Sequence, residues 1–235
     1  IGYAVAKGLL KEGVNVIINS RNEEECELAA KSLQNISEAK VFSLPGDLSD
    51  PLTPELIFKE ATKKIGTIDI LFNNCGGPPM KSILETDNTD WENAYNSIFM
   101  SSVRLTKLVI PGMIAKKWGR IITLGSSVMK EPSPQMILSA SFRAAVVSFM
   151  KAISSEVATY GITVNTISTG GVITDRLKNL VLESSKKQRI SYEEALSSSS
   201  QSIPIKRLAT PEEFSQAIIF LSSELSSYIT GECLS

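Results

Sequence analysis

The chain has 235 residues, 43% of them hydrophobic, which is enough for one substantial core, and its formal net charge is −1. This near-neutral charge, with Lys and Arg dispersed along the chain, gives no electrostatic basis for binding nucleic acid or an anionic membrane. The sequence contains no His and only three cysteines without metal-ligand spacing, which excludes His-based triads and His metal ligands and favours reduced thiols in a cytoplasmic protein without a metal.

Strand-length apolar runs rich in Val and Ile alternate with helix-length amphipathic segments. Strands are predicted at residues 14–20, 39–44, 67–74, 119–125 and 162–168. Helices are predicted at residues 3–12, 23–34, 53–64, 88–116 and 137–159. The alternation predicts a single α/β domain over residues 1–235, with a doubly wound parallel sheet covered by helices on both faces. No apolar run approaches the ~20 residues that a membrane span requires, so we expect no membrane partner.

The predicted sheet lacks members at both ends of the chain. A first strand and a Gly-rich turn should precede the helix at 3–12, and a last strand only begins after Tyr228-Ile229-Thr230-Gly231. We therefore expect a sheet without its first strand and without most of its last one, and a natural protein that is longer than this chain at both ends or of which this chain is a part. Residues 177–205 are polar and Ser-rich, and we expect a short helical excursion there that covers a site.

Short motifs follow the predicted strands, at the edge where doubly wound sheets bind ligands. Gly2 opens the first helix, whose N-terminus could receive a phosphate, although a Gly also opens many helices that bind nothing. Ser20 and Arg21 follow the strand at 14–20, where no acidic residue is present to bind the ribose 2′-hydroxyl of NAD. Arg21 could instead pair with the 2′-phosphate of NADP, or be a surface residue that caps a loop. Further motifs follow the later strands, at residues 46–48, 73–77 and 169–174.

Together with Ser126, the order and spacing of these motifs resemble the short-chain dehydrogenase/reductase family, which reduces carbonyls with a nicotinamide cofactor. Asn73-Asn74-Cys75-Gly76 is similar to the family's Asn-Asn-Ala-Gly, and Thr169-Gly170-Gly171-Val172-Ile173-Thr174 to its Pro-Gly-x-x-x-Thr, with Thr169 in place of Pro. The resemblance covers nearly the whole chain and implies a Rossmann-like fold with NADP preferred and NAD as the alternative. It implies these cofactor contacts: Gly2, Ser20, Arg21, Asp47, Leu48, Asn74, Cys75, Gly76, Arg143, Gly170, Val172 and Thr174.

Some of these contacts have a structural alternative. In the family, an Asp at the position of Asp47 meets the adenine amino group, but such an Asp also suits the cap of the next helix. The Asn-Asn-Cys-Gly segment that contains Asn74 could be an ordinary strand-to-loop turn.

The catalytic positions depart from the family pattern. There, a Ser is followed thirteen residues later by a Tyr that gives the proton, and four residues after that by a Lys. In this chain these positions are Ser126, Ser139 and Arg143, and the position of the relay Asn, seven residues after Trp91, is Ile98. An alcohol is far less acidic than a phenol, and Arg does not give up its proton. Ser139 is therefore either a weak participant or simply a small residue on a packed helix, and Arg143 either binds the cofactor ribose or lies at the surface or an interface.

Three hypotheses follow from the resemblance. The first is an NADP-preferring oxidoreductase similar to 3-oxoacyl-acyl-carrier-protein reductases, acting on a small carbonyl or alcohol substrate. Its proton would come from a water or a substrate acid held by Ser126, with Arg143 on the ribose. The second is a non-catalytic dinucleotide-binding or scaffold protein, and the third a structural subunit paired with an active paralogue. The resemblance also implies a homodimer or homotetramer formed through the helices at 88–116 and 137–159.

Overall fold

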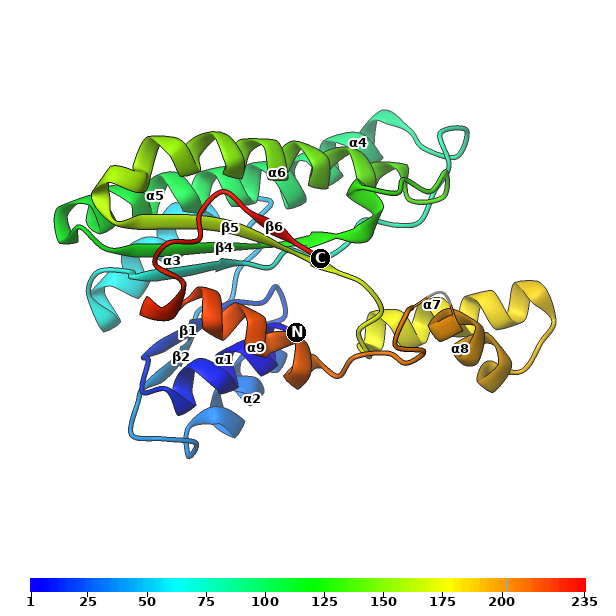
Figure 1. The fold of residues 1–235 in the computed structure, drawn as a ribbon, viewed down its shortest axis with the longest axis horizontal. Helices are drawn as coiled ribbons and strands as arrows, with labels where there is room; N and C mark the ends of the chain where they lie inside the picture. Colours follow the sequence, from blue (N-terminus) through cyan, green and yellow to red (C-terminus); the bar gives the residue numbers. More distant parts are fainter. Residues whose placement is uncertain (202) are drawn as a thin grey trace.

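The computed structural model describes residues 1–201 and 203–235 and has an α/β fold with a parallel sheet (Figure 1). Its strands are β1 (Val16–Ile18), β2 (Val41–Ser43), β3 (Ile70–Asn73), β4 (Gly119–Ser126), β5 (Ile162–Thr169) and β6 (Cys233–Leu234). β1 pairs with β2, while the other four are hydrogen-bonded in the order β3-β4-β5-β6, and every pair is parallel. The five predicted strands are confirmed, most of them shorter than expected, and β6 is the short last strand.

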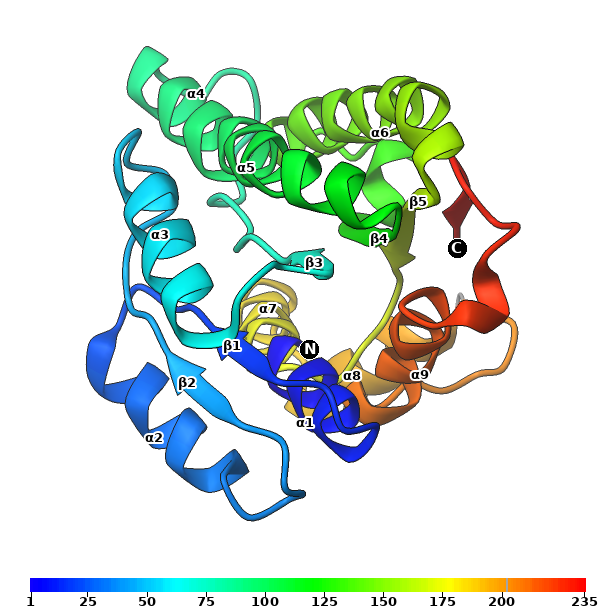
Figure 2. The same cartoon turned by 90° about the vertical axis from the view of Figure 1, so that its left-hand side faces the viewer.

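Helices cover both faces of this sheet (Figure 2). They are α1 (Gly2–Lys11), α2 (Glu23–Leu33), α3 (Thr53–Ile65), α4 (Asn88–Ala94), α5 (Ser101–Lys116), α6 (Ile137–Val157), α7 (Asp175–Gln188), α8 (Tyr192–Gln201) and α9 (Pro211–Leu221). α1 packs against α2 and α9 on one face, and α3 against α5 on the other, where α6 also lies on β4 and β5. The prediction of a doubly wound sheet is confirmed. The predicted excursion at 177–205 corresponds to α7 and α8, which stand apart from the sheet (Figure 1), and its residue 202 lies outside the described residues.

The central strands supply two apolar cores because their side chains alternate between faces. Ile122 and Leu124 of β4 pack with α1 and α9, whereas Ile121 packs with α5 and α6. β5 divides in the same way, with Ile167 on the first side and Val164 on the second. Burial on both faces explains why these strands read as nearly continuous Val- and Ile-rich runs.

The predicted helix at 88–116 is interrupted by one wider segment. A π-helix, Tyr95–Met100, joins α4 to α5. Just beyond it, Ser101 Oγ donates to the Ser97 carbonyl at 2.6 Å and Ser102 Oγ to the Ile98 carbonyl at 3.0 Å. Hydroxyls that bond back to the preceding turn distort regular helix geometry, so the side chains of this stretch suit the wider turn.

Two helical stretches, Asn88–Lys116 and Ile137–Tyr160, are long and apolar enough to cross a membrane. The expectation that no segment reaches that length is therefore wrong. Both stretches cover the sheet, and Met113 and Met150 are buried in the core beneath them. Packing against the sheet accounts for part of this apolar composition, since 33% and 39% of the most apolar windows of the two stretches are buried.

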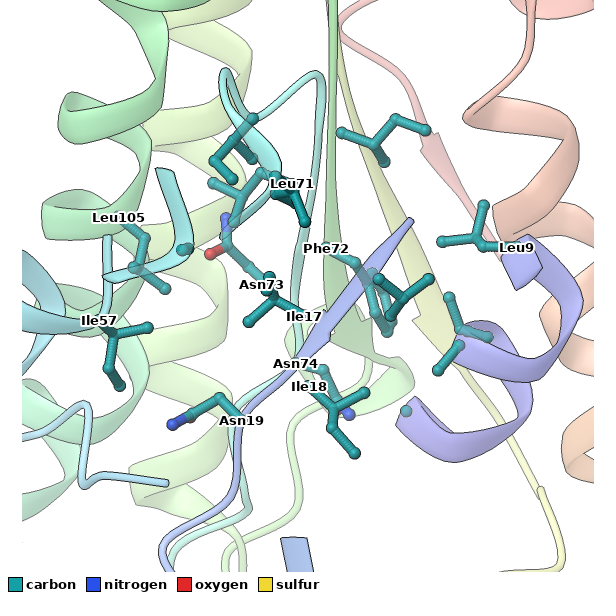
Figure 3. Close-up of a pocket in the computed structure, with 18 of the residues that line it drawn as sticks. Leu9, Ile17, Ile18, Asn19, Ile57, Leu71, Phe72, Asn73, Asn74 and Leu105 are labelled. Carbon is teal, nitrogen blue, oxygen red and sulfur yellow. The ribbon is translucent and has the colours of Figure 1, made fainter. Parts of the chain in front are cut away.

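An apolar groove separates the two parts of the sheet (Figure 3). It has a volume of about 1110 Å³ and lies between β1 and β3, lined by Leu9 of α1, Ile17, Ile57, Phe72 and Leu105 among others. No strand among residues 1–201 and 203–235 pairs with the inner edge of either β1 or β3. This arrangement agrees with the expected absence of a central strand from the sheet.

The unpaired inner edges of β1 and β3 lead us to predict fast hydrogen exchange of the backbone amides that face the groove. Alternate residues of β1 bond to β2, beginning with Val16 N–H on the Lys40 carbonyl, and alternate residues of β3 bond to β4, beginning with Arg120 N–H on the Asp69 carbonyl. Ile17 and Phe72 belong to the other set in each strand, so their backbone groups point into the groove. We expect the amides of Ile17 and Phe72 to exchange with deuterium far faster than that of Val164 in β5, which is buried and donates to the Thr230 hydroxyl at 3.0 Å. Hydrogen exchange of the 235-residue chain tests this, and equal protection of the three amides would contradict unpaired inner edges on β1 and β3.

Candidate functional site

The predicted site residues gather at the carboxyl edge of the sheet, because all strands are parallel and the loops that follow them meet there. Asn19 Nδ2 donates to the Leu44 carbonyl at 2.8 Å and the Gly46 carbonyl at 3.1 Å, which ties the loop after β1 to the loop after β2. A Cβ on Gly2 would lie 2.8 Å from Asn74 Nδ2, so the glycine lets α1 approach the loop after β3 closely without moving the Asn74 side chain.

The exposed backbone of this edge fits a dinucleotide. α1 begins without a side-chain cap and without an acidic residue in its first turn, so its free N–H groups are available to an anion. Gly76 and Gly170 have open space where a Cβ would stand, so a ligand can lie directly on their backbone. These features match the positions predicted for a nicotinamide cofactor, whose diphosphate needs free N–H donors.

Residues predicted for the adenosine end lie in the loops after β1 and β2. The Ser20 carbonyl accepts a hydrogen bond from Gly46 N–H at 3.0 Å, which fixes the backbone of Ser20. Arg21 is exposed. Asp47 accepts from the N–H and hydroxyl of Ser49 at 2.9 and 2.8 Å, and Leu48 lines the apolar groove.

The alternative prediction that Asp47 caps the following helix is wrong. Asp50 accepts from the N–H groups of Leu52 and Thr53 at the start of α3, at 2.7 and 3.1 Å. Asp47 instead shapes its own loop, and its second carboxylate oxygen has no partner among the described residues.

The loop after β5 carries further residues predicted to contact the cofactor. Val172 is buried and forms a β-bridge with Ala209. Thr174 caps α7 by accepting a hydrogen bond from Leu177 N–H at 3.2 Å, which leaves the proton of its hydroxyl free to be donated.

Arg143 extends from α6 to the end of β4 and to the loop after β3, near the predicted catalytic residues Ser126 and Ser139. It lies on α6, one turn after Ser139, and both side chains are buried, with 7% and 4% exposed. Arg143 Nη1 donates to the Leu124 carbonyl at 2.6 Å, and Nη2 to the Cys75 carbonyl at 3.5 Å. These contacts place Arg143 between β4, which ends at Ser126, and the loop after β3. The reading of Arg143 as a surface residue is therefore wrong.

The environment of Arg143 and its neighbours limits their chemistry. Ile98 is buried in the apolar cluster under α6 and supplies no polar group at the position of the family's Asn. Burial raises the pKa of the Cys75 thiol, and the positive charge of Arg143 opposes that rise only in part, so Cys75 is a thiol rather than a nucleophilic thiolate at neutral pH. Among residues 1–201 and 203–235 no group of three His, Cys, Asp or Glu is placed to hold a metal.

Arg176 is a site residue that the sequence reasoning missed. It lies in the first turn of α7, and its guanidinium donates to the Gly77 and Pro78 carbonyls, both at 3.0 Å. These acceptors directly follow Asn74-Cys75-Gly76, so α7 is fastened to the loop that carries the predicted cofactor contacts. Arg176 and its two acceptors are 98 to 99 residues apart in the sequence, so no local sequence pattern predicts this contact.

Comparison with known proteins agrees with this geometry. The family model described as "Enoyl-(Acyl carrier protein) reductase" matches residues 1–235. The chain is 34% identical over 236 residues to the 3-oxoacyl-[acyl-carrier-protein] reductase FabG of Buchnera aphidicola subsp. Acyrthosiphon pisum, covering 100% of this chain and 90% of that protein. It is 32% identical to the NADPH-dependent reductase BacG of Bacillus subtilis, over 100% of this chain and 91% of that protein.

Solved structures are similar over almost the same range. YwfH, an NADPH-dependent reductase involved in bacilysin biosynthesis, superposes with a TM-score of 0.93 at 30% identity, covering 99% of this chain and 90% of that one. L-Sorbose reductase from Gluconobacter frateurii, in complex with NADPH and L-sorbose, gives a TM-score of 0.93 at 29% identity over 98% of this chain and 88% of that one. With this fold, these loops at the carboxyl edge and a match along its whole length, the chain belongs to the short-chain dehydrogenase/reductase family.

Proposed function

We propose that the protein is an NADP-dependent oxidoreductase that transfers a hydride between the cofactor and a small carbonyl or alcohol substrate. The observation that carries this proposal is the position of Arg143, a buried cation held on the Leu124 and Cys75 carbonyls at the end of β4. Relatives named as NADPH-dependent reductases, and a neighbour solved with NADPH, support NADP as the cofactor.

Different residues at the carboxyl edge of the sheet would bind different parts of the cofactor. The N-terminus of α1 at Gly2 would hold the diphosphate, and Arg21 the 2′-phosphate. Asp47 would meet the adenine with its free carboxylate oxygen, while Thr174 would donate to the carboxamide. Cofactor contacts are also proposed for Ser20, Leu48, Asn74, Cys75, Gly76, Gly170 and Val172.

Arg143 would bind the nicotinamide ribose. A guanidinium has five N–H donors, and the contacts to the Leu124 and Cys75 carbonyls use only two of them. The remaining donors can serve ribose hydroxyls, but the group stays charged throughout and supplies no proton.

The substrate oxygen must receive its proton by another route. When bound, the nicotinamide supplies the hydride, and Ser126 is the remaining residue of the family's catalytic set. Its hydroxyl can hold the substrate oxygen and a water, and the water or an acid of the substrate gives the proton. Ser139 lies one turn from Arg143 and is too short to replace a phenol, so we assign it at most a minor catalytic role.

A specific observation favours a second candidate function. Ile98, Ser139 and Arg143 all depart from the family's set, and Ile98 and Ser139 are buried without a titratable group. A dinucleotide-binding or scaffold protein without catalysis, or a structural subunit beside an active paralogue, has the same features. Turnover of cofactor with any carbonyl substrate would exclude the scaffold.

The assembly and the covering segment are proposals of the same kind. We propose a homodimer or homotetramer formed through α4–α5 and α6, which carry a partly exposed aromatic cluster of Tyr95, Phe99, Phe142 and Phe149. We also propose that residues 1–235 form a single domain in which the segment 177–205 covers the substrate. The protein would be cytoplasmic.

Cofactor affinity is the experiment that tests the proposed function. Titration of the full-length protein, followed by cofactor fluorescence, is expected to show micromolar binding of NADPH and weaker binding of NADH. Replacing Arg21 with Met should weaken NADPH binding by about tenfold and leave NADH unchanged, since only NADPH carries the 2′-phosphate. Glu23, Glu24 and Glu25 follow Arg21 in the first turn of α2, and their charges oppose an anion, which keeps the expected preference modest.

Arg207 provides a matched control for Arg21. It pairs with Glu213 at 2.7 Å, away from the loop after β1, so Arg207→Met should leave both affinities unchanged. Equal loss of NADPH and NADH in Arg21→Met would contradict the 2′-phosphate assignment. A folded protein that binds neither cofactor would overturn the oxidoreductase proposal in favour of the scaffold.

A further inference from the structure

Two arginines hold the loop after β3 through neutral acceptors only. Arg143 donates to the Cys75 carbonyl at 3.5 Å, and Arg176 to the Gly77 and Pro78 carbonyls at 3.0 Å each. Neither guanidinium has a carboxylate within 4.0 Å among residues 1–201 and 203–235. Carbonyls are weaker partners than the carboxylates and phosphates that match the fork of a guanidinium.

The two positive charges act on one another. The pKa of Arg176 is lowered, first by burial and then by the charge of Arg143, whereas Glu183 opposes the shift from a distance. Asp175, the residue before Arg176, pairs with Lys178 at 3.1 Å, so its charge is already partnered. Arg143 and Arg176 are thus two cations held on the loop after β3 without a carboxylate partner within 4.0 Å among the described residues.

The loop between the acceptors of the two arginines has an open backbone position at Gly76. Gly76 stands between Cys75 and Gly77, the acceptors of Arg143 and Arg176, and nothing lies within 4 Å of the place where its Cβ would be. A Cβ on Gly77, in contrast, would overlap the guanidinium of Arg176, so that group lies flat on the loop. The open backbone at Gly76 therefore adjoins the carbonyls that hold the two arginines.

From this arrangement, and resting on the proposed oxidoreductase function, we propose that Arg176 binds a carboxylate of the substrate, with the charge of Arg143 supporting it. The substrate class is then an oxo acid or a hydroxy acid rather than a neutral ketone. The diphosphate of the cofactor is a second source of the same anionic chemistry. The contact of Arg143 with Leu124, two residues before Ser126, points toward the substrate, but Gly2 at the N-terminus of α1 also approaches Asn74 of the same loop, so malonate and pyrophosphate titrations separate the two sources.

Calorimetric titration of the full-length protein with malonate tests the assignment. With NADPH at saturation, malonate is expected to bind, the neutral malonamide is not, and Arg176→Met should weaken malonate at least tenfold. Arg176→Lys should lose less, because it keeps the charge and loses only the bidentate geometry. Arg207→Met, which removes an exposed arginine paired with Glu213, is the matched control and should bind malonate like the wild type.

The remaining outcomes decide between the two sources of the anion. Malonate that is displaced by NADPH, together with inorganic pyrophosphate binding that disappears in Arg176→Met, would assign Arg176 to the cofactor and overturn the substrate site. Unchanged malonate affinity in Arg176→Met, or no malonate binding at all in protein that binds NADPH, would also overturn it and leave the proposed oxidoreductase intact. Failure to bind NADPH would count against the oxidoreductase itself. The malonate and pyrophosphate titrations repeated without NADPH then show whether Arg176 binds an anion at all.

Discussion

Replacing Arg143 with Met is expected to weaken NADPH and NADH binding equally, by roughly 10- to 100-fold. The guanidinium is buried and fixed by the Leu124 and Cys75 carbonyls, so its free donors are already oriented for the ribose that both cofactors share. A hydrogen bond from a charged group contributes about 1.5–3 kcal/mol, which corresponds to this range of affinity. Fluorescence titration with each cofactor measures the loss.

Loss of the ribose contact must be separated from loss of the fold. Met keeps the apolar stem of Arg143 but leaves the Leu124 and Cys75 carbonyls without their donor, so thermal unfolding must be followed alongside binding. Arg143→Lys, which keeps one charged donor, should bind more tightly than Arg143→Met. A folded Arg143→Met protein with wild-type affinity for both cofactors would show that Arg143 supports the loop after β3 and does not touch the cofactor.

The apolar pattern along the chain predicted the strand and helix layers of this fold, because the spacing of apolar residues within a segment indicates which of its faces are buried. β4 and β5 read as continuous apolar runs since both of their faces are buried, and the intervening segments read as amphipathic helices. The π-helix at Tyr95–Met100 could not be predicted in this way, since it depends on a one-residue change of hydrogen-bond pattern inside an otherwise regular helix.

The site could be predicted only where residues follow strands. Parallel strands bring the loops after β1 to β5 to one edge, so positions such as Asn74 and Gly170 could be placed from the order of elements alone. Burial of Arg143 and the reach of Arg176 to Gly77 depend on the packing of α6 and α7 in three dimensions. Those two contacts bring two cations onto the loop after β3, and no local sequence pattern predicts either of them.

Introducing a phenol at position 139 is expected to raise carbonyl reduction by NADPH by roughly 10²–10⁴-fold, the usual contribution of a general acid. Ser139 lies on α6 one turn before Arg143, so a Tyr there would stand beside the guanidinium. The positive charge of Arg143 favours the phenolate and lowers the phenol pKa, which brings the acid closer to neutral pH. Ser139→Tyr alone and Ser139→Tyr with Arg143→Lys, assayed with an oxo acid and with its neutral ester, measure the gain.

Ser139→Phe is the matched control, because it adds the same ring without the hydroxyl. Position 139 is buried, so both substitutions carry the same packing strain, and only the phenol should increase the rate. The gain should fall as pH rises through the phenol pKa, since the reduction needs the protonated form, and Ser126→Ala should remove much of it by releasing the substrate oxygen. An equal gain in Ser139→Phe would attribute the effect to packing. No gain in a folded Ser139→Tyr protein that still binds NADPH would mean that the cleft cannot position a carbonyl for hydride transfer, which is the behaviour of a scaffold.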